Sequence, residues 1–333
     1  MAIRLCSYNI EWFTRLFNDD NTLSDKPKDV DRLDAIAEVI KNLNADLIGI
    51  VEAPHTVKDG SHTTVRKLEN FATQYNLRTS KALTGFISVG TQEIAVLYDP
   101  AILTVLHEPA GTSNPEDNPR FDRVFHFDAD NDRIFEVYNH HRPPLEAKVK
   151  INTSNKEFRL LVAHVKSKGV FDNVDMIHLE REARRNRLKI YAECRWIRNH
   201  VDEWLDNGHN VVVMGDINDG PGMDEYEMRY GKSGVEVIMG SLFEPDKILR
   251  NPAGMPKWGD FGWEPSTAQF TDRFTGDPIN VMIDHILISN SFKTSGGTPL
   301  QIWNPYQNEQ MKPLQADLVK ASDHFPVTID LEL

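Results

Sequence analysis

Five apolar, strand-like stretches of this sequence carry polar side chains at one end. In α/β proteins the ends of neighbouring strands converge at one edge of a sheet, and ligands bind at that edge. The side chains are carboxylates, amides and imidazoles, and no serine or cysteine stands beside a base as a nucleophile would. This combination suits attack by a water molecule that a metal ion assists. The residues are Asn9, Glu52, His164, Asp216 with Asn218, and Asp323 with His324.

The central stretch is residues 211–222, where a run of β-branched residues is followed at once by Gly215 and a cluster of turn formers. The run predicts a buried strand that ends in a loop. Asp216 and Asn218 are two residues apart, so both side chains leave the same face if the strand continues through them. Such a pair suits a water, a hard cation or a phosphate oxygen. The same residue types also occur in an ordinary strand-to-turn transition, where they serve the backbone.

Helical and strand-like patterns alternate in the first part of the chain, which favours an α/β fold. A strand predicted over 4–10 precedes a polar stretch, 18–28, that we expect to be an exposed insertion. The periodicity then predicts helices beginning at Asp31 and over 65–75, a buried strand over 46–51, and strands over 94–98 and 102–106.

The second part begins with residues 108–132, which are rich in Pro, Asn and Asp and predict a long surface loop. Strands over 133–138, 145–151 and 157–165 suit antiparallel hairpins, and a long helix over 175–206 leads into the strand at 211. Residues 243–275 have no clear period and predict an ordered surface excursion, and further strands are expected over 281–288 and at the C-terminus. Because no low-complexity linker separates these segments, we expect a single domain over 1–333.

Composition limits the class of protein and its partners. Of the 333 residues, 40% are hydrophobic and 26% are charged, which is ordinary for a globular protein with a large core. Two cysteines, Cys6 and Cys194, are too few for a disulfide framework or a thiolate metal site, so any metal would be held by oxygen and nitrogen. The net charge of −13 opposes broad, non-specific binding to nucleic acid. With no predicted membrane span or signal peptide, we expect a cytoplasmic protein, monomeric by default.

Seven short motifs follow one another from Ser7 to His324 and together resemble the endonuclease/exonuclease/phosphatase superfamily of divalent-metal phosphohydrolases. The resemblance implies a four-layer α/β/β/α sandwich, in which two mixed sheets pack face to face and helices cover the outside. It also implies a deoxyribonuclease-like enzyme that uses Mg²⁺ or Mn²⁺. The motifs are Ser7-Tyr-Asn-Ile-Glu11, Asp46-Leu-Ile-Gly-Ile-Val-Glu52, Arg142-Pro-Pro-Leu145, Ala163-His164, Gly215-Asp-Ile-Asn-Asp219, Ile283-Asp-His-Ile-Leu287 and Ser322-Asp-His324.

The same resemblance implies roles for the metal ligands and the base. Glu52 is the principal metal ligand, with Asn9 and Asp323 beside it, and oxygen donors suit such hard cations. His324 is the general base, and Asp323 orients its imidazole and makes it more basic. Asp216 is the competing candidate for activating the water, and the sequence does not separate the two.

The remaining roles concern the phosphate. By resemblance, Asn218 and His164 donate to its non-bridging oxygens, and Arg142 contacts it together with Asn9. Asp284 orients a neighbouring group or adds to metal binding. Each residue type also has a purely structural interpretation: His164 as a core histidine, Asp284 as a buried partner of another donor, and Arg142 as a surface cation. That interpretation is the stronger one for two other polar residues of the motifs, Glu11 and His285.

The substrate is argued from the residues after His164. The run Val165-Lys-Ser-Lys-Gly169, followed by a helix with Arg181, Arg184, Arg185 and Arg187, resembles a bacterial nuclease-like branch of the superfamily. These arginines predict a cationic strip, although the interleaved glutamates are equally typical of an ordinary solvated helix. The run Lys257-Trp-Gly-Asp-Phe-Gly-Trp263 suggests a base-stacking aromatic, a lipid contact or a hydrophobic cover.

The sequence therefore predicts metal-dependent hydrolysis of phosphodiester bonds by activated water, with an endonuclease or exonuclease acting on nucleic acid as the leading subclass. One alternative is a phosphatase or phospholipase-like phosphodiesterase acting on a small or lipid phosphate. An alternative of another class is a non-catalytic protein that binds a phosphate ligand.

Overall fold

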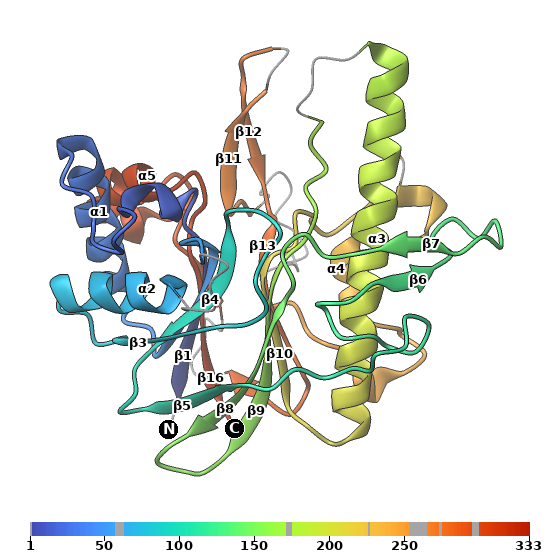
Figure 1. Ribbon diagram of the computed structural model, residues 1–333, viewed down its shortest axis with the longest axis horizontal. Coiled ribbons are helices and arrows are strands. Elements are labelled where there is room, and N and C mark those ends of the chain that lie inside the picture. Colours follow the sequence, from blue (N-terminus) through green and yellow to red (C-terminus); the bar gives the residue numbers. More distant parts are fainter. Residues whose placement is uncertain are drawn as a thin grey trace.

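The computed structural model describes residues 2–56, 63–170, 175–225, 227–252, 265–272, 275–294 and 300–333. The predicted aromatic run 257–263 lies outside these residues. Two mixed sheets face each other, and helices cover the outer surface of each (Figure 1). The four-layer α/β/β/α sandwich is thereby confirmed.

The first sheet is built around a parallel pair, β1 and β2, with antiparallel strands on both sides. Its strand order is β14-β16-β1-β2-β4-β3, and β15 also pairs with β16. The strands are β1 (Ile3–Asn9), β2 (Leu47–Ala53), β3 (Lys81–Thr84), β4 (Glu93–Tyr98), β14 (Lys293–Thr294), β15 (Leu300–Ile302) and β16 (Val327–Glu332).

The second sheet repeats this plan around the parallel pair β9 and β10, in the order β13-β10-β9-β8-β5. Two short hairpins, β6–β7 and β11–β12, stand outside the two sheets. The strands are β5 (Leu103–His107), β6 (Phe125–Phe127), β7 (Glu136–Tyr138), β8 (Leu145–Ile151), β9 (Glu157–His164), β10 (Val211–Asp216), β11 (Ala268–Thr271), β12 (Pro278–Val281) and β13 (Asp284–Ile288).

Helices α1, α2 and α5 cover the first sheet, and α3 and α4 cover the second (Figure 1). The long helix α3 begins after Asp175, whose carboxylate accepts the backbone N–H of His178 as an N-cap. No helix among the described residues is both long enough and apolar enough to cross a bilayer. The helices are α1 (Pro27–Leu43), α2 (Thr63–Gln74), α3 (Met176–Asp206), α4 (Gly234–Met239) and α5 (Gln315–Ala321), with 3-10 turns at Phe13–Leu16, Glu227–Arg229, Pro245–Lys247 and Glu309–Leu314.

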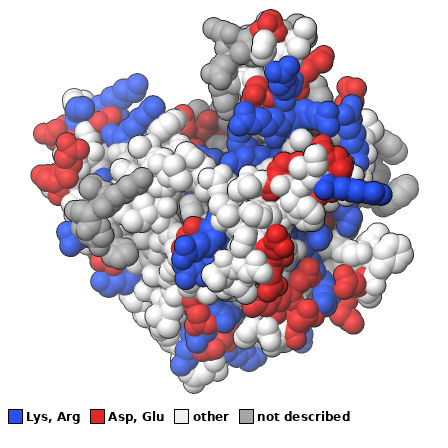
Figure 2. Space-filling view, turned by 45° about the vertical axis from the view of Figure 1, so that its right-hand side comes forward, with Lys and Arg blue, Asp and Glu red and all other residues white. Residues whose placement is uncertain are grey.

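Charge is unevenly distributed on the surface, although the chain as a whole is acidic. Figure 2 shows basic side chains gathered in the upper part of one face, whereas acidic and basic side chains are interspersed lower down. A local concentration of cations is therefore present despite the net charge of −13.

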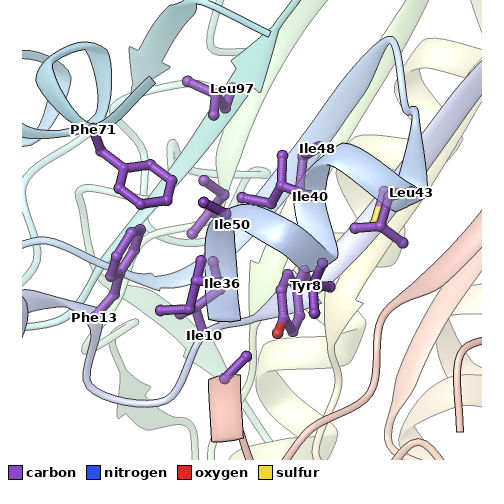
Figure 3. Close-up of a cluster of buried hydrophobic side chains, with 14 of the residues drawn as sticks. Tyr8, Ile10, Phe13, Ile36, Ile40, Leu43, Ile48, Ile50, Phe71 and Leu97 are labelled. Carbon is purple, nitrogen blue, oxygen red and sulfur yellow. The ribbon is translucent and has the colours of Figure 1, made fainter. Parts of the chain in front are cut away.

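The apolar periodicity of α1 explains how it packs on the first sheet. Ile36, Ile40 and Leu43 lie on one helical face, and Figure 3 shows them beside side chains of β1 and β2, including Tyr8 and Ile50. A second apolar layer fills the space between the sheets, and a third lies between the second sheet and α3. These three layers hold the strand ends in a fixed arrangement.

Several predicted boundaries differ from the structure. The first helix begins at Pro27 rather than Asp31, because proline suits the first helical position. The stretch 108–132 is not simply a surface loop: it contains β6, and its Phe121 and Phe125 are buried beside Trp196. The strand predicted over 281–288 is divided between β12 and β13, so that Asp284 begins a strand instead of interrupting one.

Candidate active site

The strand ends of both sheets meet at one cleft, as the polar residues in the sequence predict. In the second sheet Asp216 is the register partner of both His164 and Asp284. In the first sheet Asn9 ends β1, opposite the residue that precedes Glu52. The cleft has a volume of about 670 Å³ and is lined by Asn9, Glu52, His164, Asp216, Asn218 and His324, among others.

The imidazole of His324 is held by Asp284, which corrects the predicted pairing with Asp323. Nδ1 of His324 lies 2.8 Å from Oδ2 of Asp284. Asp323 lies on the other side of the ring, with Oδ1 3.9 Å from Nε2. Burial lowers the pKa of His324, but the carboxylates of Asp284, Asp216 and Asp323 together raise it to about 10. His324 is therefore an imidazolium at neutral pH in the metal-free protein.

Asp216 lies at the centre of the polar cluster. Its Oδ1 accepts the backbone N–H of Asn218 at 2.8 Å, and its Oδ2 accepts an amide N–H of Asn9 at 3.0 Å. His164 Nε2 lies 3.6 Å from the same Oδ2. Burial, and then the charge of Asp284, raise the pKa of Asp216 to about 7. This carboxylate can therefore exchange a proton near neutral pH.

The backbone after β10 has the conformation that this cluster needs. Gly215 has φ 133°, and a Cβ at this position would lie 2.0 Å from the carbonyl oxygen of Ala163 on β9. Asn218 has φ 54°, which asparagine tolerates better than most residues, and it donates a side-chain N–H to the carbonyl of Val165 at 3.0 Å. Gly215 and Asn218 thus have a backbone role in the turn after β10, and they also help to shape the cleft.

Glu52 projects from an irregular position in β2. Its φ is 59°, and the pairing of β2 with β4 shifts register at this residue, as at a β-bulge. Oε2 accepts the backbone N–H of Trp12 at 2.8 Å and a side-chain N–H of Gln92, whose Oε1 accepts from Arg142 at 2.8 Å. Burial raises the pKa of Glu52, while the Trp12 N–H and the charge of Arg142 oppose the shift.

Three oxygen atoms around the cleft fit a hard cation. Oδ1 of Asn9 and Oδ1 of Asp323 are buried without a hydrogen-bond donor in the described part of the chain, and Oε1 of Glu52 likewise receives none. Buried polar atoms normally have partners, so a ligand is expected to supply them here. Carboxylate and amide oxygens are the atoms that Mg²⁺ and Mn²⁺ prefer.

A second group of ligand-type atoms, from Asp216, Asp284 and His324, lies within 4.8 Å of one another. Oδ2 of Asp284 and Nδ1 of His324 form a hydrogen bond with each other, whereas Oδ1 of Asp284 is buried without a partner among the described residues. This group is therefore a second candidate metal site.

The remaining predicted residues fall into two classes. Arg142 reaches the cleft and is fixed there by Gln92. His285 does not: its ring nitrogens lie near the Asp219 carbonyl and the amide of Asn251. Glu11 also lines the cleft, and its backbone N–H donates to the hydroxyl of Ser322.

Three of the four arginines in the cationic strip predicted on α3 have an acidic side chain nearby. Arg187 donates to Asp224 at 2.9 Å, and Arg184 and Arg185 lie 3.4 Å from acidic partners. The cations that line the cleft are instead Arg142, Lys166 and Lys189.

Sequence reasoning missed Gln92 and Lys189 as residues of the cleft. Gln92 stands immediately before the apolar run of β4, and a polar residue at a strand end is the signal that found the others. Lys189 lies in a helix among many charges, and nothing local distinguishes it.

Comparisons with known proteins agree with this geometry. Residues 6–324 match the Endonuclease/Exonuclease/phosphatase family. Comparison with curated proteins gives no match. Three similar solved structures are reported, and at identities of 18% or less they show a shared fold. TDP2 from D. rerio, complexed with single strand DNA product, has a TM-score of 0.53 at 10% identity, over 100% of this chain and 99% of that chain. Truncated TDP2 from Caenorhabditis elegans has a TM-score of 0.53 at 14% identity (100% and 98% covered), and an endonuclease/exonuclease/phosphatase from Bacteroides vulgatus has 0.50 at 18% (100% and 99%).

Proposed function

Because the chain belongs to the endonuclease/exonuclease/phosphatase family, whose members are phosphoesterases, we propose that it hydrolyses phosphodiester bonds with a divalent cation. The substrate we propose is nucleic acid, and the cation is Mg²⁺ or Mn²⁺. The observation that carries the proposal is the buried arrangement of Asp216, His324 and Asp284 beside a cleft with partnerless oxygens.

In this proposal Glu52, Asn9 and Asp323 hold the cation. When bound, the cation supplies Lewis-acid stabilisation of charge on the phosphoryl oxygens. Oδ1 of Asn9 and Oδ1 of Asp323, which receive no hydrogen bond from the described residues, support this role.

Asp216 accepts the proton of the attacking water. Its pKa of about 7 suits this transfer at neutral pH, and the neighbouring carboxylates favour the protonated form of His324. The imidazolium of His324, fixed by Asp284, stabilises negative charge on the phosphate. His164, Asn218 and Arg142 are placed to contact the non-bridging oxygens.

The choice of nucleic acid rests on the cations that line the cleft, Arg142, Lys166 and Lys189. A short cationic groove suits a chain of phosphates even when the whole protein is acidic. The similar D. rerio TDP2 structure contains a single-stranded DNA product, which is consistent with this choice.

The test is cleavage of supercoiled plasmid and of bis(p-nitrophenyl) phosphate, each with Mg²⁺, Mn²⁺ or chelator. We expect both to be cleaved with a cation and neither with chelator. Hydrolysis of the small diester alone would exclude nucleic acid but retain phosphodiester chemistry. Binding of phosphate ligands without any hydrolysis, whether or not Mg²⁺ is present, would contradict the enzyme assignment.

A further inference from the structure

The motif Lys166-Ser-Lys-Gly169 follows the cleft residue His164, and its two lysines have different surroundings. Nζ of Lys168 lies 2.5 Å from Asp219 and 2.6 Å from Glu227, so its charge is used inside the protein. Lys166 instead lines the cleft. The two lysines therefore need separate explanations.

Lys166 and Lys189 together connect the cleft to a neighbouring pocket. Both residues line the 670 Å³ cleft, and both also line an adjoining pocket of about 360 Å³ whose wall includes Arg185 and Asn186. A ligand bound at the catalytic residues can therefore extend past these two lysines without a change in the backbone.

The groups around this passage carry an excess of positive charge. Burial lowers the pKa of His141, and the neighbouring charges of Arg142, Lys189 and Lys166 lower it further. Burial also lowers the pKa of Lys166; the charge of Glu193 opposes this shift, and those of Lys189 and Arg142 add to it. These directions show that the cations are near enough to repel one another.

Glu193 and Glu182 are the acids that act on this cluster. The carboxylate of Glu193 is buried; it lies 3.7 Å from Nζ of Lys189 and accepts the backbone N–H of Lys166 at 2.8 Å. Glu182 is on the wall of the adjoining pocket and lies near Arg185, at 3.4 Å. Because Arg142 also faces Glu52 and Asp216, the two acids face Lys166, Lys189 and Arg185, and an anion from solution would balance the one remaining positive charge.

We propose that Lys166 and Lys189 form a second phosphate subsite, which binds the phosphate group next to the scissile one in an oligonucleotide. The proposal rests on the phosphodiesterase function proposed above and defines its substrate class as diesters with a flanking phosphate. Arg142 is fixed by Gln92 beside Glu52 and so remains with the scissile phosphate. Lys166 and Lys189, at the passage to the adjoining pocket, are left for the neighbouring phosphate.

The test compares three dinucleotides that differ only in a flanking phosphate: dTpdT, pdTpdT and dTpdTp. For the wild-type protein with Mg²⁺ we expect kcat/KM to be about tenfold higher for one phosphorylated dinucleotide than for dTpdT, the size of one charge-assisted hydrogen bond. The side of the extra phosphate gives the direction in which the strand lies. In Lys189→Gln and in Lys166→Gln this ratio should fall toward one.

The ratio cancels any change in the absolute rate, so a general loss of activity does not imitate the result. Lys189→Arg retains the charge and should keep most of the ratio. Lys41→Gln removes an exposed lysine from the last turn of α1 and should leave the ratio unchanged. Equal kcat/KM for all three dinucleotides, or a ratio that survives both glutamine variants, would overturn the subsite. If the protein hydrolyses neither the dinucleotides nor bis(p-nitrophenyl) phosphate, the proposed function itself is overturned.

Discussion

Two clusters of polar side chains lie close to the end of β10, and they differ in how their atoms are satisfied. In the first, which we call the Lys168 cluster, Lys168 lies between the carboxylates of Asp219 and Glu227, and Arg187 pairs with Asp224. Asp219 also accepts backbone N–H groups of residues 220 and 234. Two cations thus lie among three carboxylates, and each carboxylate has a lysine or arginine beside it.

In the cleft, by contrast, several buried polar atoms have no hydrogen-bond partner among the described residues. Oδ1 of Asn9, Oδ1 of Asp323 and Nδ1 of His164 are buried without a hydrogen-bond partner in the described residues. Leaving a buried polar atom unsatisfied costs roughly 1 to 3 kcal/mol, so such atoms persist where another molecule supplies the missing contact. The comparison teaches that burial is shared by both clusters, whereas the lysine ammonium that Lys168 supplies to Asp219 and Glu227 has no counterpart among the described residues beside Asn9 and Asp323.

The largest expected effect concerns Asp284, which belongs to the cleft but contacts His324 rather than solvent. Asp284→Asn removes the charge that stabilises the imidazolium, and we expect kcat to fall on the order of 10³-fold. The measurement is hydrolysis of bis(p-nitrophenyl) phosphate at saturating Mg²⁺, with circular dichroism to verify folding.

Asp323→Asn is the matched control, because Asp323 is also a carboxylate beside His324. As a proposed metal ligand it should mainly raise the Mg²⁺ concentration required. If Asp323→Asn abolishes kcat at saturating Mg²⁺ while Asp284→Asn does not, the predicted pairing of His324 with Asp323 would be restored.

The second prediction tests whether the Lys168 cluster is structural. Lys168→Met leaves the buried carboxylates of Asp219 and Glu227 without their cation, and the free energy of unfolding should fall by about 3 kcal/mol, the low end for a broken buried pair. Urea unfolding measures the loss.

Lys189 offers a control of the same residue type and similar exposure. Its side chain is 27% exposed against 26% for Lys168, but its ion pair with Glu193 spans 3.7 Å. We expect Lys189→Met to cost less than Lys168→Met, because Glu193 keeps the backbone N–H of Lys166 as a hydrogen-bond donor. Equal losses for the two variants would remove the distinction between the clusters.

The third prediction concerns Glu52 as a metal ligand. Glu52→Gln keeps an oxygen that can accept the N–H of Trp12 but removes the charge, so the Mg²⁺ concentration for half-maximal activity should rise about 100-fold, the upper range for perturbing a metal site. The rise in melting temperature on adding Mg²⁺ should shrink in parallel, which reports binding without catalysis.

Glu11→Gln is the control for this experiment, because Glu11 lines the same cleft and is not a proposed ligand. It should leave the Mg²⁺ dependence close to that of the wild type. An unchanged Mg²⁺ dependence in Glu52→Gln would exclude Glu52 as a ligand.

Most of the fold and the position of the cleft could be predicted from the sequence, because the relevant signals are local. Asn9, Glu52, His164 and Asp216 each end an apolar run, and strand ends on one edge must converge. The long helix was likewise visible, with Asp175 as its cap.

Contacts between distant segments could not be predicted in this way. Asp323 adjoins His324 in the sequence, yet the partner of Nδ1 is Asp284, 40 residues away on β13. Neighbouring residues in an extended segment point to opposite sides, so adjacency is a poor guide to side-chain pairing. The arginines of α3 could be read directly from the sequence. The acids that pair with Arg187 and Arg184 come from distant segments and could not be predicted.

The smallest predicted effect comes from His140, a buried group that lies away from the catalytic residues. His140 Nε2 is buried without a hydrogen-bond partner, and the ring packs against Phe121 and Trp196. Burial lowers the pKa of His140 well below its ordinary value of 6.5. As the pH falls through 6.5, the unfolded chain therefore binds a proton that the native protein does not, and stability is lost at acid pH.

Between pH 7.5 and 5.5 this single proton should remove about 1.4 kcal/mol from the free energy of unfolding. His140→Phe keeps an aromatic ring and cannot titrate, so it should lose that much less than the wild type over the same interval. Urea unfolding of both proteins at the two pH values measures the difference. Equal losses would mean that native His140 is protonated at pH 5.5, and hence that its Nε2 has a partner, such as solvent, at that pH.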